Sequence, residues 1–360
     1  MRPLPLTLSL LTMVGLALAV FPYDPAYRAE SLREWRWTFL EPLVLLILLT
    51  IGATRRRDRT LLAIGLMAGG TVAAGQAFLD LVTGGGVAVA GVTRIAGPYP
   101  HPNALALFEA RIAALAFAWW VYSSRRSAWL LVPAAVVGLA VAATLSRGAM
   151  LAMLVAGALT LPHLPRVMRA AAVVVTAVAF GTLTVVARDR MLDLFSGGSG
   201  SLRIDIWTSA IEMISARPFV GYGPDQFLYA YLPRYVQPTA WGERFTAHAH
   251  NIVFDFWIRL GIIGLAFTML VGVVCARLTL RTIQGRSDGA LRAAATVALV
   301  ASLTHGLIDN AYFTHDLAMS GWLLAWFALG QRVADSSEGV DDVARPGYGR
   351  RRIHRFSSLR

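Results

Sequence analysis

The chain contains one almost continuous apolar stretch, Ile252-Val-Phe-Asp-Phe-Trp-Ile-Arg-Leu-Gly-Ile-Ile-Gly-Leu-Ala-Phe-Thr-Met-Leu-Val-Gly-Val-Val-Cys275. A stretch of about 18 or more apolar residues with few charges is typical of a transmembrane helix. The sequence Ala247-His248-Ala249-His250-Asn251 directly precedes it. The two histidines are therefore predicted at a membrane–water boundary, where a proton acceptor can meet a lipid-borne substrate. The alternative is an interfacial histidine with no chemistry.

The composition supports a membrane protein. Hydrophobic residues make up 56% of the 360 residues and charged residues 15%, with a mean hydropathy of +0.57, unlike an ordinary soluble domain. The net charge of +12 comes from arginine alone, because the chain has no lysine. In a membrane protein such an excess indicates cytoplasmic loops and lipid headgroups rather than nucleic acid. The single cysteine excludes an internal disulfide and a cysteine-based metal site.

Apolar segments recur along the chain and predict an all-α, polytopic transmembrane helical bundle with about ten spans. We expect an integral membrane domain over residues 1–334 and a basic cytoplasmic tail without a fold over 335–360. The first segment resembles a signal peptide but lacks a convincing cleavage site, so we interpret it as an uncleaved helix. The predicted spans are approximately 4–20, 39–53, 60–82, 103–122, 128–144, 147–162, 169–187, 251–275, 291–309 and 316–332.

Arginine placement predicts the topology. If every segment crosses, the arginine-rich short loops and the tail fall on one face, which the positive-inside rule makes cytoplasmic together with both termini. The long loop 188–250 then faces outward. It begins with a Gly/Ser-rich hinge, and the apolar spacing from Arg203 to Ala216 predicts an amphipathic helix on the bilayer surface.

Three arginines on the predicted outer face are candidates for phosphate contact. They are Arg94, Arg147 in the turn Leu145-Ser-Arg-Gly-Ala149, and Arg203 at the start of the amphipathic helix. Guanidinium groups bind phosphate bidentately and keep their charge, which suits a diphosphate leaving group. Each could instead be a snorkelling or topology-setting residue. Asn103, which follows a Pro-rich turn, is a plausible N-cap of the fourth span.

Several motifs together resemble the bacterial O-antigen ligase superfamily, which also contains O-antigen and exopolysaccharide polymerases. His250-Asn251, nine residues and Gly261-Ile-Ile-Gly264 match its H-[N/S/Q]-x9-G-x-x-G signature. The resemblance covers about residues 90 to 330. The further matching stretches are Arg203-x3-Trp207-x2-Ala210, Arg217-Pro218-x2-Gly221-x-Gly223-x3-Phe227, Ser146-Arg147-Gly148-Ala149 and the segment from Gly97 to Asn103.

The resemblance implies a GT-C-like, metal-independent glycosyltransferase without a cofactor, active on the extracytoplasmic face of a bacterial inner membrane. The donor would be an undecaprenyl-diphosphate-linked glycan and the acceptor a glycan or lipid-glycan hydroxyl. Arg147 and Arg203 would hold the diphosphate, and His250 would act as the base. We expect the substrate site to include Arg94, Asn103, Trp207, Asn251 and His248.

Alternatives stay open at this point. A zinc site at His248 and His250 is possible, although the sequence shows no third ligand at metal spacing nearby. Ten spans with intramembrane ionisable groups also fit a transporter or a flippase of lipid-linked glycans. Asp255 and Arg259 are expected to pair at i,i+4, and Asp309 could orient His250. The sequence does not separate a ligase from a polymerase.

Overall fold

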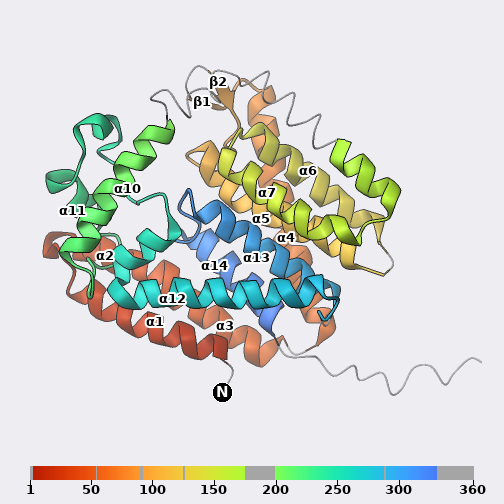
Figure 1. Ribbon diagram of the computed structural model, residues 1–360, viewed down its shortest axis with the longest axis horizontal. Helices are drawn as coiled ribbons and strands as arrows, with labels where there is room; N and C mark the ends of the chain where they lie inside the picture. The colour runs from red at the N-terminus through yellow and green to blue at the C-terminus, as the bar shows by residue number, and fades with distance from the viewer. Residues whose placement is uncertain are drawn as a thin grey trace, which may run out of the picture.

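The structure is a computed structural model that describes residues 3–53, 55–89, 92–124, 126–174, 199–287 and 289–330. Nearly all of its regular structure is helical (Figure 1). The exception is a two-stranded antiparallel hairpin of β1 (Val87–Val89) and β2 (Val92–Arg94). The predicted all-α class is therefore confirmed apart from this hairpin, which the sequence analysis missed.

The N-terminal part of the chain is built of long helices. After α1, consecutive helical segments run without a break from residue 25 to residue 52, and a short loop leads to α4. These elements are α1 (Pro3–Val20), η1 (Pro25–Tyr27), α2 (Arg28–Trp35), the π-helical η2 (Arg36–Leu40), α3 (Glu41–Gly52) and α4 (Arg56–Val82).

In the rest of the chain, α12 and α5 are the longest described helices. The chain is also helical over 166–174. The elements are α5 (Pro102–Tyr122), η3 (Ala128–Leu130), α6 (Leu131–Ala143), α7 (Arg147–Thr160), η4 (Leu161–His163), α10 (Ser199–Ala216), α11 (Phe227–Arg234), η5 (Pro238–Glu243), α12 (Ile252–Ile283), α13 (Ala290–Gly306) and α14 (His315–Leu329).

Two helices, α5 and α13, form the centre of the bundle. α13 packs against α5, α7 and α14, and Figure 1 shows it between α14 and the group formed by α5, α6 and α7. Both central helices are rich in buried alanine, which lets helix backbones approach closely. The buried alanines include Ala106, Ala110, Ala113 and Ala114 of α5 and Ala294, Ala295, Ala298 and Ala301 of α13. The predicted fourth and ninth spans, which correspond to α5 and α13, therefore form the core of the bundle.

The predicted count of ten spans is not confirmed and stays a prediction. Among the described residues, four helices are long and apolar enough to cross a membrane, whereas α1 and α6 are apolar but shorter. The predicted segment 39–53 is only the C-terminal part of a longer helical path. The four candidates are Pro25–Gly52, Arg56–Val82, Pro102–Tyr122 and Ile252–Ile283.

Some sequence predictions fall on residues that the structure does not describe. The predicted span 169–187 is described only as far as residue 174, and the predicted outer loop only from residue 199. The predicted domain boundary at residue 334 and the tail 335–360 also lie outside the described residues. These features stay predictions.

α12 is interrupted at Gly261, where the backbone adopts φ 60° and ψ −145°. A side chain at this position would collide with the Phe219 carbonyl. The Ile262 N–H donates to that same carbonyl at 3.1 Å, and the Tyr222 N–H donates to the Ile258 carbonyl at 2.7 Å. Residues 219–222 insert into the helix break and leave no room for a side chain at Gly261, the first glycine of the G-x-x-G pattern. The backbone angles at this position are also ones that only glycine adopts without strain.

The topology can be tested at two exposed positions, Gly242 in η5 and Gln284 after α12. We expect Gly242→Cys to react with a membrane-impermeant thiol reagent in intact spheroplasts, in a Cys275→Ala background. Gln284→Cys should react only after permeabilisation, because the arginine-rich loops mark the cytoplasmic side. Reaction in the opposite order would overturn the orientation.

Candidate active site

His250 lies directly before α12 with an unusual backbone conformation. Its φ is 52°, in the left-handed region that residues with a Cβ rarely adopt. Asn251 is the N-cap of α12, because its Oδ1 accepts hydrogen bonds from the Val253 and Phe254 N–H groups at 2.9 and 3.3 Å. Its Nδ2 donates to the Leu307 carbonyl at 3.0 Å. Asn251 therefore fixes His250 against the segment after α13, while its predicted contact with substrate stays a prediction.

Asp309, after the end of α13, orients the His250 ring. His250 Nδ1 lies 3.0 Å from Asp309 Oδ1, so the contact considered from the sequence is present. Burial alone would raise the pKa of Asp309, but the hydrogen bond from His250 and the neighbouring histidines hold this pKa well below its usual value. The ionised carboxylate therefore accepts the Nδ1 proton, and the lone pair of His250 is on Nε2.

Two side chains of α10, in the predicted outer loop, reach this pair. Arg203 Nη2 lies 3.9 Å from Asp309 Oδ2. One turn further along, the Trp207 ring packs edge-on against Phe254 at 6.3 Å between centroids. Arg203 Nε and Trp207 Nε1 are both buried and have no hydrogen-bond acceptor among the described residues. Because a buried donor without an acceptor is costly, these two groups indicate a place for a ligand that offers oxygen atoms.

Arg147 is the first residue of α7, and its turn packs against the end of α13. Ser146 is the N-cap, with its Oγ 3.5 Å from the Ala149 nitrogen. A Cβ on Gly148 would lie 2.7 Å from His305 Nε2, so the turn requires glycine at residue 148. His305 is one helical turn before Asp309, and Arg147 is thus on the side of the bundle that carries His250.

The buried Arg94 pairs with the partly buried Asn103. Arg94 Nη2 donates to Asn103 Oδ1 at 2.9 Å, and Arg94 Nε donates to the Thr144 carbonyl. The prediction that Asn103 is the N-cap is wrong, because His101 caps α5: its Nδ1 accepts a hydrogen bond from the Asn103 N–H at 3.1 Å. Partial burial and the Arg94 charge lower the pKa of His101, which keeps this nitrogen an acceptor. The proposed substrate contacts of Arg94 and Asn103 stay predictions.

Behind His250, the buried side chain of Arg259 holds the histidine segment. Its Nε and Nη2 donate to the two carboxylate oxygens of Glu34 at 2.9 and 3.0 Å. Its Nη1 donates to Asp255 Oδ1 at 3.2 Å, which confirms the predicted i,i+4 pair. Asp255 Oδ1 also accepts from the Ala249 N–H at 2.8 Å. The buried charges of α2 and α12 therefore bind the backbone next to His250.

Arg259 also contacts the segment that carries Asp309. Its Cζ lies 4.0 Å from the Phe313 ring centroid, and Asn310 Oδ1 accepts from the Phe313 N–H at 2.9 Å. The chain segments that carry His250 and Asp309 are thus both tied to one guanidinium. Sequence reasoning missed Glu34, for which the only signal is an acidic residue near the start of an apolar segment.

His248 brings a second imidazole to the site. Its ring centroid lies 4.1 Å from that of His250. Burial lowers the pKa of His248 to about 3, so its ring is neutral. One potential ligand atom from each of His248, His250 and Asp309 lies within 4.8 Å of the others. The zinc alternative thus gains the third ligand that the sequence did not show, 59 residues after His250.

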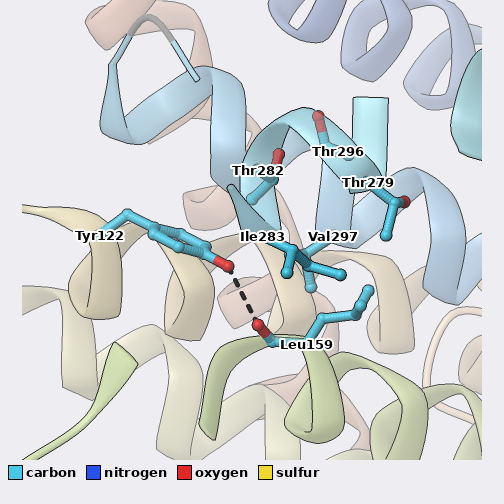
Figure 2. Close-up of a pocket in the computed structure, with 7 residues that line it drawn as sticks. All are labelled: Tyr122, Leu159, Thr279, Thr282, Ile283, Thr296 and Val297. Carbon is cyan, nitrogen blue, oxygen red and sulfur yellow. Dashed lines mark hydrogen bonds between the residues drawn. The ribbon is translucent and has the colours of Figure 1, made fainter. Parts of the chain in front are cut away.

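A pocket elsewhere in the bundle carries no comparable chemistry. It is a shallow, partly open hollow at the opposite end of α12 from His250. Figure 2 shows that its polar groups are hydroxyls, and the Tyr122 hydroxyl is already bonded to the Leu159 carbonyl at 3.1 Å. The lining residues are Tyr122, Leu159, Thr279, Thr282, Ile283, Thr296 and Val297. This pocket contains no titratable pair, so the candidate site remains the one at His250.

Comparisons with known proteins identify a family that part of this chain resembles. Residues 134–269 match the model of the family described as O-Antigen ligase. A segment of 132 residues is 30% identical to the ComP-specific O-oligosaccharyltransferase of Acinetobacter baylyi. That alignment covers 36% of this chain and 23% of the relative, so the similarity spans about a quarter of that protein. The resemblance to the O-antigen ligase superfamily is confirmed, and the matched region contains Arg147, Arg203 and His250.

The role of the buried charge cluster can be tested at Glu34. We expect Glu34→Gln to lower both the thermal midpoint in detergent and the activity, because Arg259 loses a charged partner in the interior. Breaking a buried ion pair typically costs about 3–5 kcal/mol. The matched control is Glu41→Gln, which removes a half-exposed carboxylate paired with Arg36 at 3.2 Å and should cost about 1 kcal/mol or less. Equal effects of the two substitutions would contradict the importance of the cluster.

Proposed function

We propose that this protein is a membrane glycosyltransferase that moves a glycan from a diphosphate-linked lipid carrier to an acceptor hydroxyl, without a metal. One observation carries the proposal. An oriented His250–Asp309 pair stands beside Arg203 and Trp207, whose buried donors have no acceptor among the described residues. A base and unpaired donors for an oxyanion, brought together at one site, are what this transfer requires.

The base in this proposal is His250. Because Asp309 accepts the Nδ1 proton, Nε2 is free to take the proton of an acceptor hydroxyl. In the structure Nε2 lies 3.4 Å from Thr246 Oγ1, and the acceptor hydroxyl would replace this weak contact. As the proton moves to Nε2, the acceptor oxygen forms a bond to the anomeric carbon of the donor glycan. The bond from that carbon to the diphosphate oxygen breaks, and its electron pair leaves with the diphosphate.

The diphosphate in this proposal is bound by Arg203 and Arg147, with Trp207 Nε1 as an additional donor. Guanidinium groups stabilise the charge that develops on the leaving oxygen without a metal ion. Arg203 has a direct role because its Nε is buried without an acceptor among the described residues. Arg147 contributes from the α7 turn, which packs on the end of α13.

We further propose undecaprenyl diphosphate as the carrier and the extracytoplasmic face of the inner membrane as the site of reaction. The position of His250 at the start of the long apolar helix α12 supports a lipid-linked donor. The acceptor is proposed to be a glycan or a lipid-linked glycan. The similarity to a protein named an O-oligosaccharyltransferase supports transfer to an acceptor over a transporter or flippase. Purified protein in detergent should therefore transfer glycan without a membrane gradient.

The base assignment can be tested by comparing the two histidines. We expect His250→Ala to lower the transfer rate by about 10²- to 10⁴-fold, the usual contribution of a general base. His248→Ala should be milder, because Asp309 orients only His250 by a hydrogen bond of 3.0 Å. Glycan transfer is measured with purified protein and a defined lipid-linked donor, at matched membrane abundance. Normal transfer by the His250→Ala variant would remove the base assignment.

The diphosphate contacts can be tested by changing the shape of the cation while keeping its charge. Arg203→Lys and Arg147→Lys should each lower the transfer rate by an amount equivalent to about 2–4 kcal/mol, because an ammonium group does not replace a planar fork. The control is Arg234→Lys at the exposed end of α11, which should leave the rate unchanged. Wild-type rates for both site variants would show that these arginines do not bind the diphosphate.

A further inference from the structure

We propose that His248, His250 and Asp309 also form an inhibitory site for a divalent transition-metal ion of the zinc class. This inference rests on the proposed function, since inhibition requires that His250 be the base. Two imidazoles and one carboxylate are a common ligand set for such ions, and they leave a coordination position for water. The three groups come from two segments that are already packed together, the turn before α12 and the connection after α13.

The distances suit a metal ion with little rearrangement. Zinc binds nitrogen and oxygen ligands at about 2.0–2.2 Å, so two ligands of a tetrahedral ion lie about 3.3 Å apart. His250 Nδ1 and Asp309 Oδ1 are already 3.0 Å apart. One ligand atom from each of His248, His250 and Asp309 lies within 4.8 Å of the other two, and a rotation of the His248 side chain toward the pair would complete the set. Asp309 is fixed by its neighbours, because its Oδ1 also accepts from the Asn310 N–H at 2.9 Å.

The ion would inhibit because it requires the opposite tautomer of His250. In the proposed reaction, Nδ1 carries a proton that it donates to Asp309, and Nε2 is the base. An ion shared with Asp309 takes the lone pair of Nδ1, which is the nearer nitrogen. The single ring proton then moves to Nε2, which loses its ability to accept the acceptor proton. Metal binding and base catalysis therefore exclude each other at this histidine.

The positive charge of Arg203 limits the affinity of the site for a metal ion. Its guanidinium lies 3.9 Å from Asp309, so an incoming dication meets a like charge. Arg203 carries its charge on a side chain that is 23% exposed, and it can turn toward solvent or toward an anion. An anionic donor that pairs with Arg203 would reduce this repulsion, so the diphosphate and the metal ion can occupy the site together.

Direct metal binding is the first test. Full-length protein without a polyhistidine tag is purified in detergent, stripped with a chelator and titrated with Co²⁺. We expect a visible absorption band typical of tetrahedral Co²⁺, which Zn²⁺ displaces. His248→Gln and Asp309→Asn should each weaken Co²⁺ binding at least tenfold. His315→Gln, which changes a half-exposed histidine paired with Glu41, is the matched control and should bind as wild type does. A missing band in the wild-type protein, or unchanged binding in both site variants, would overturn the metal site.

Activity is the second test, and it separates this inference from the proposed function. Chelated wild-type enzyme should be fully active, and Zn²⁺ at the concentration that displaces Co²⁺ should reduce transfer at least tenfold, reversibly with EDTA. Binding without inhibition would overturn the inhibitory role. Activation by Zn²⁺ would overturn both the inhibitory role and the metal-free base mechanism. Co²⁺ binding at these residues in a protein that transfers no glycan under any condition would leave the metal site standing and overturn the proposed function.

Discussion

The position of the candidate base depends on the buried guanidinium of Arg259. A cation in an apolar interior carries a desolvation cost on the order of several kcal/mol, which only well-placed partners offset. Here the partners come from three places along the chain: Glu34 in α2, Asp255 within α12 and the Phe313 ring before α14. Because Arg259 needs these partners at once, α2, the start of α12 and the connection carrying Asp309 are fixed in one arrangement.

The break at Gly261 separates the first turns of the long apolar helix α12, next to the candidate base, from the rest of the helix. The short part of α12 before the break carries Asp255 and Arg259, and the backbone around Gly221 inserts against it. A Cβ on Gly221 would lie 2.6 Å from the Ile258 carbonyl, so the insertion requires glycine on both sides. Through this insertion, the predicted outer loop is attached to the first turns of α12. The same attachment places α10, with Arg203, beside His250.

Sequence reasoning succeeded where the determining contacts are local. The apolar runs predicted helices, and the spacing of Asp255 and Arg259 predicted their pairing, because both patterns follow from one helical period. The partner of Arg259 could not be found, since Glu34 lies 225 residues away in a segment with no distinguishing pattern. The capping role assigned to Asn103 was wrong because its side chain pairs with Arg94, and the preceding histidine caps the helix instead. The number of spans stays a prediction, because helix length and apolar composition do not by themselves show which helices cross a membrane.

At the candidate site, His250 is held rigidly by its neighbours, whereas Arg203 is not. The left-handed backbone of His250 costs about 1–3 kcal/mol, a strain that persists only where neighbouring contacts determine the geometry. Asn251 on one side and Asp255 on the other provide these contacts. Arg203 differs, because its 3.9 Å separation from Asp309 is too long for a hydrogen bond. Arg203 is thus paired with Asp309 by charge rather than by a hydrogen bond, and in the proposed reaction its buried Nε is available to the diphosphate.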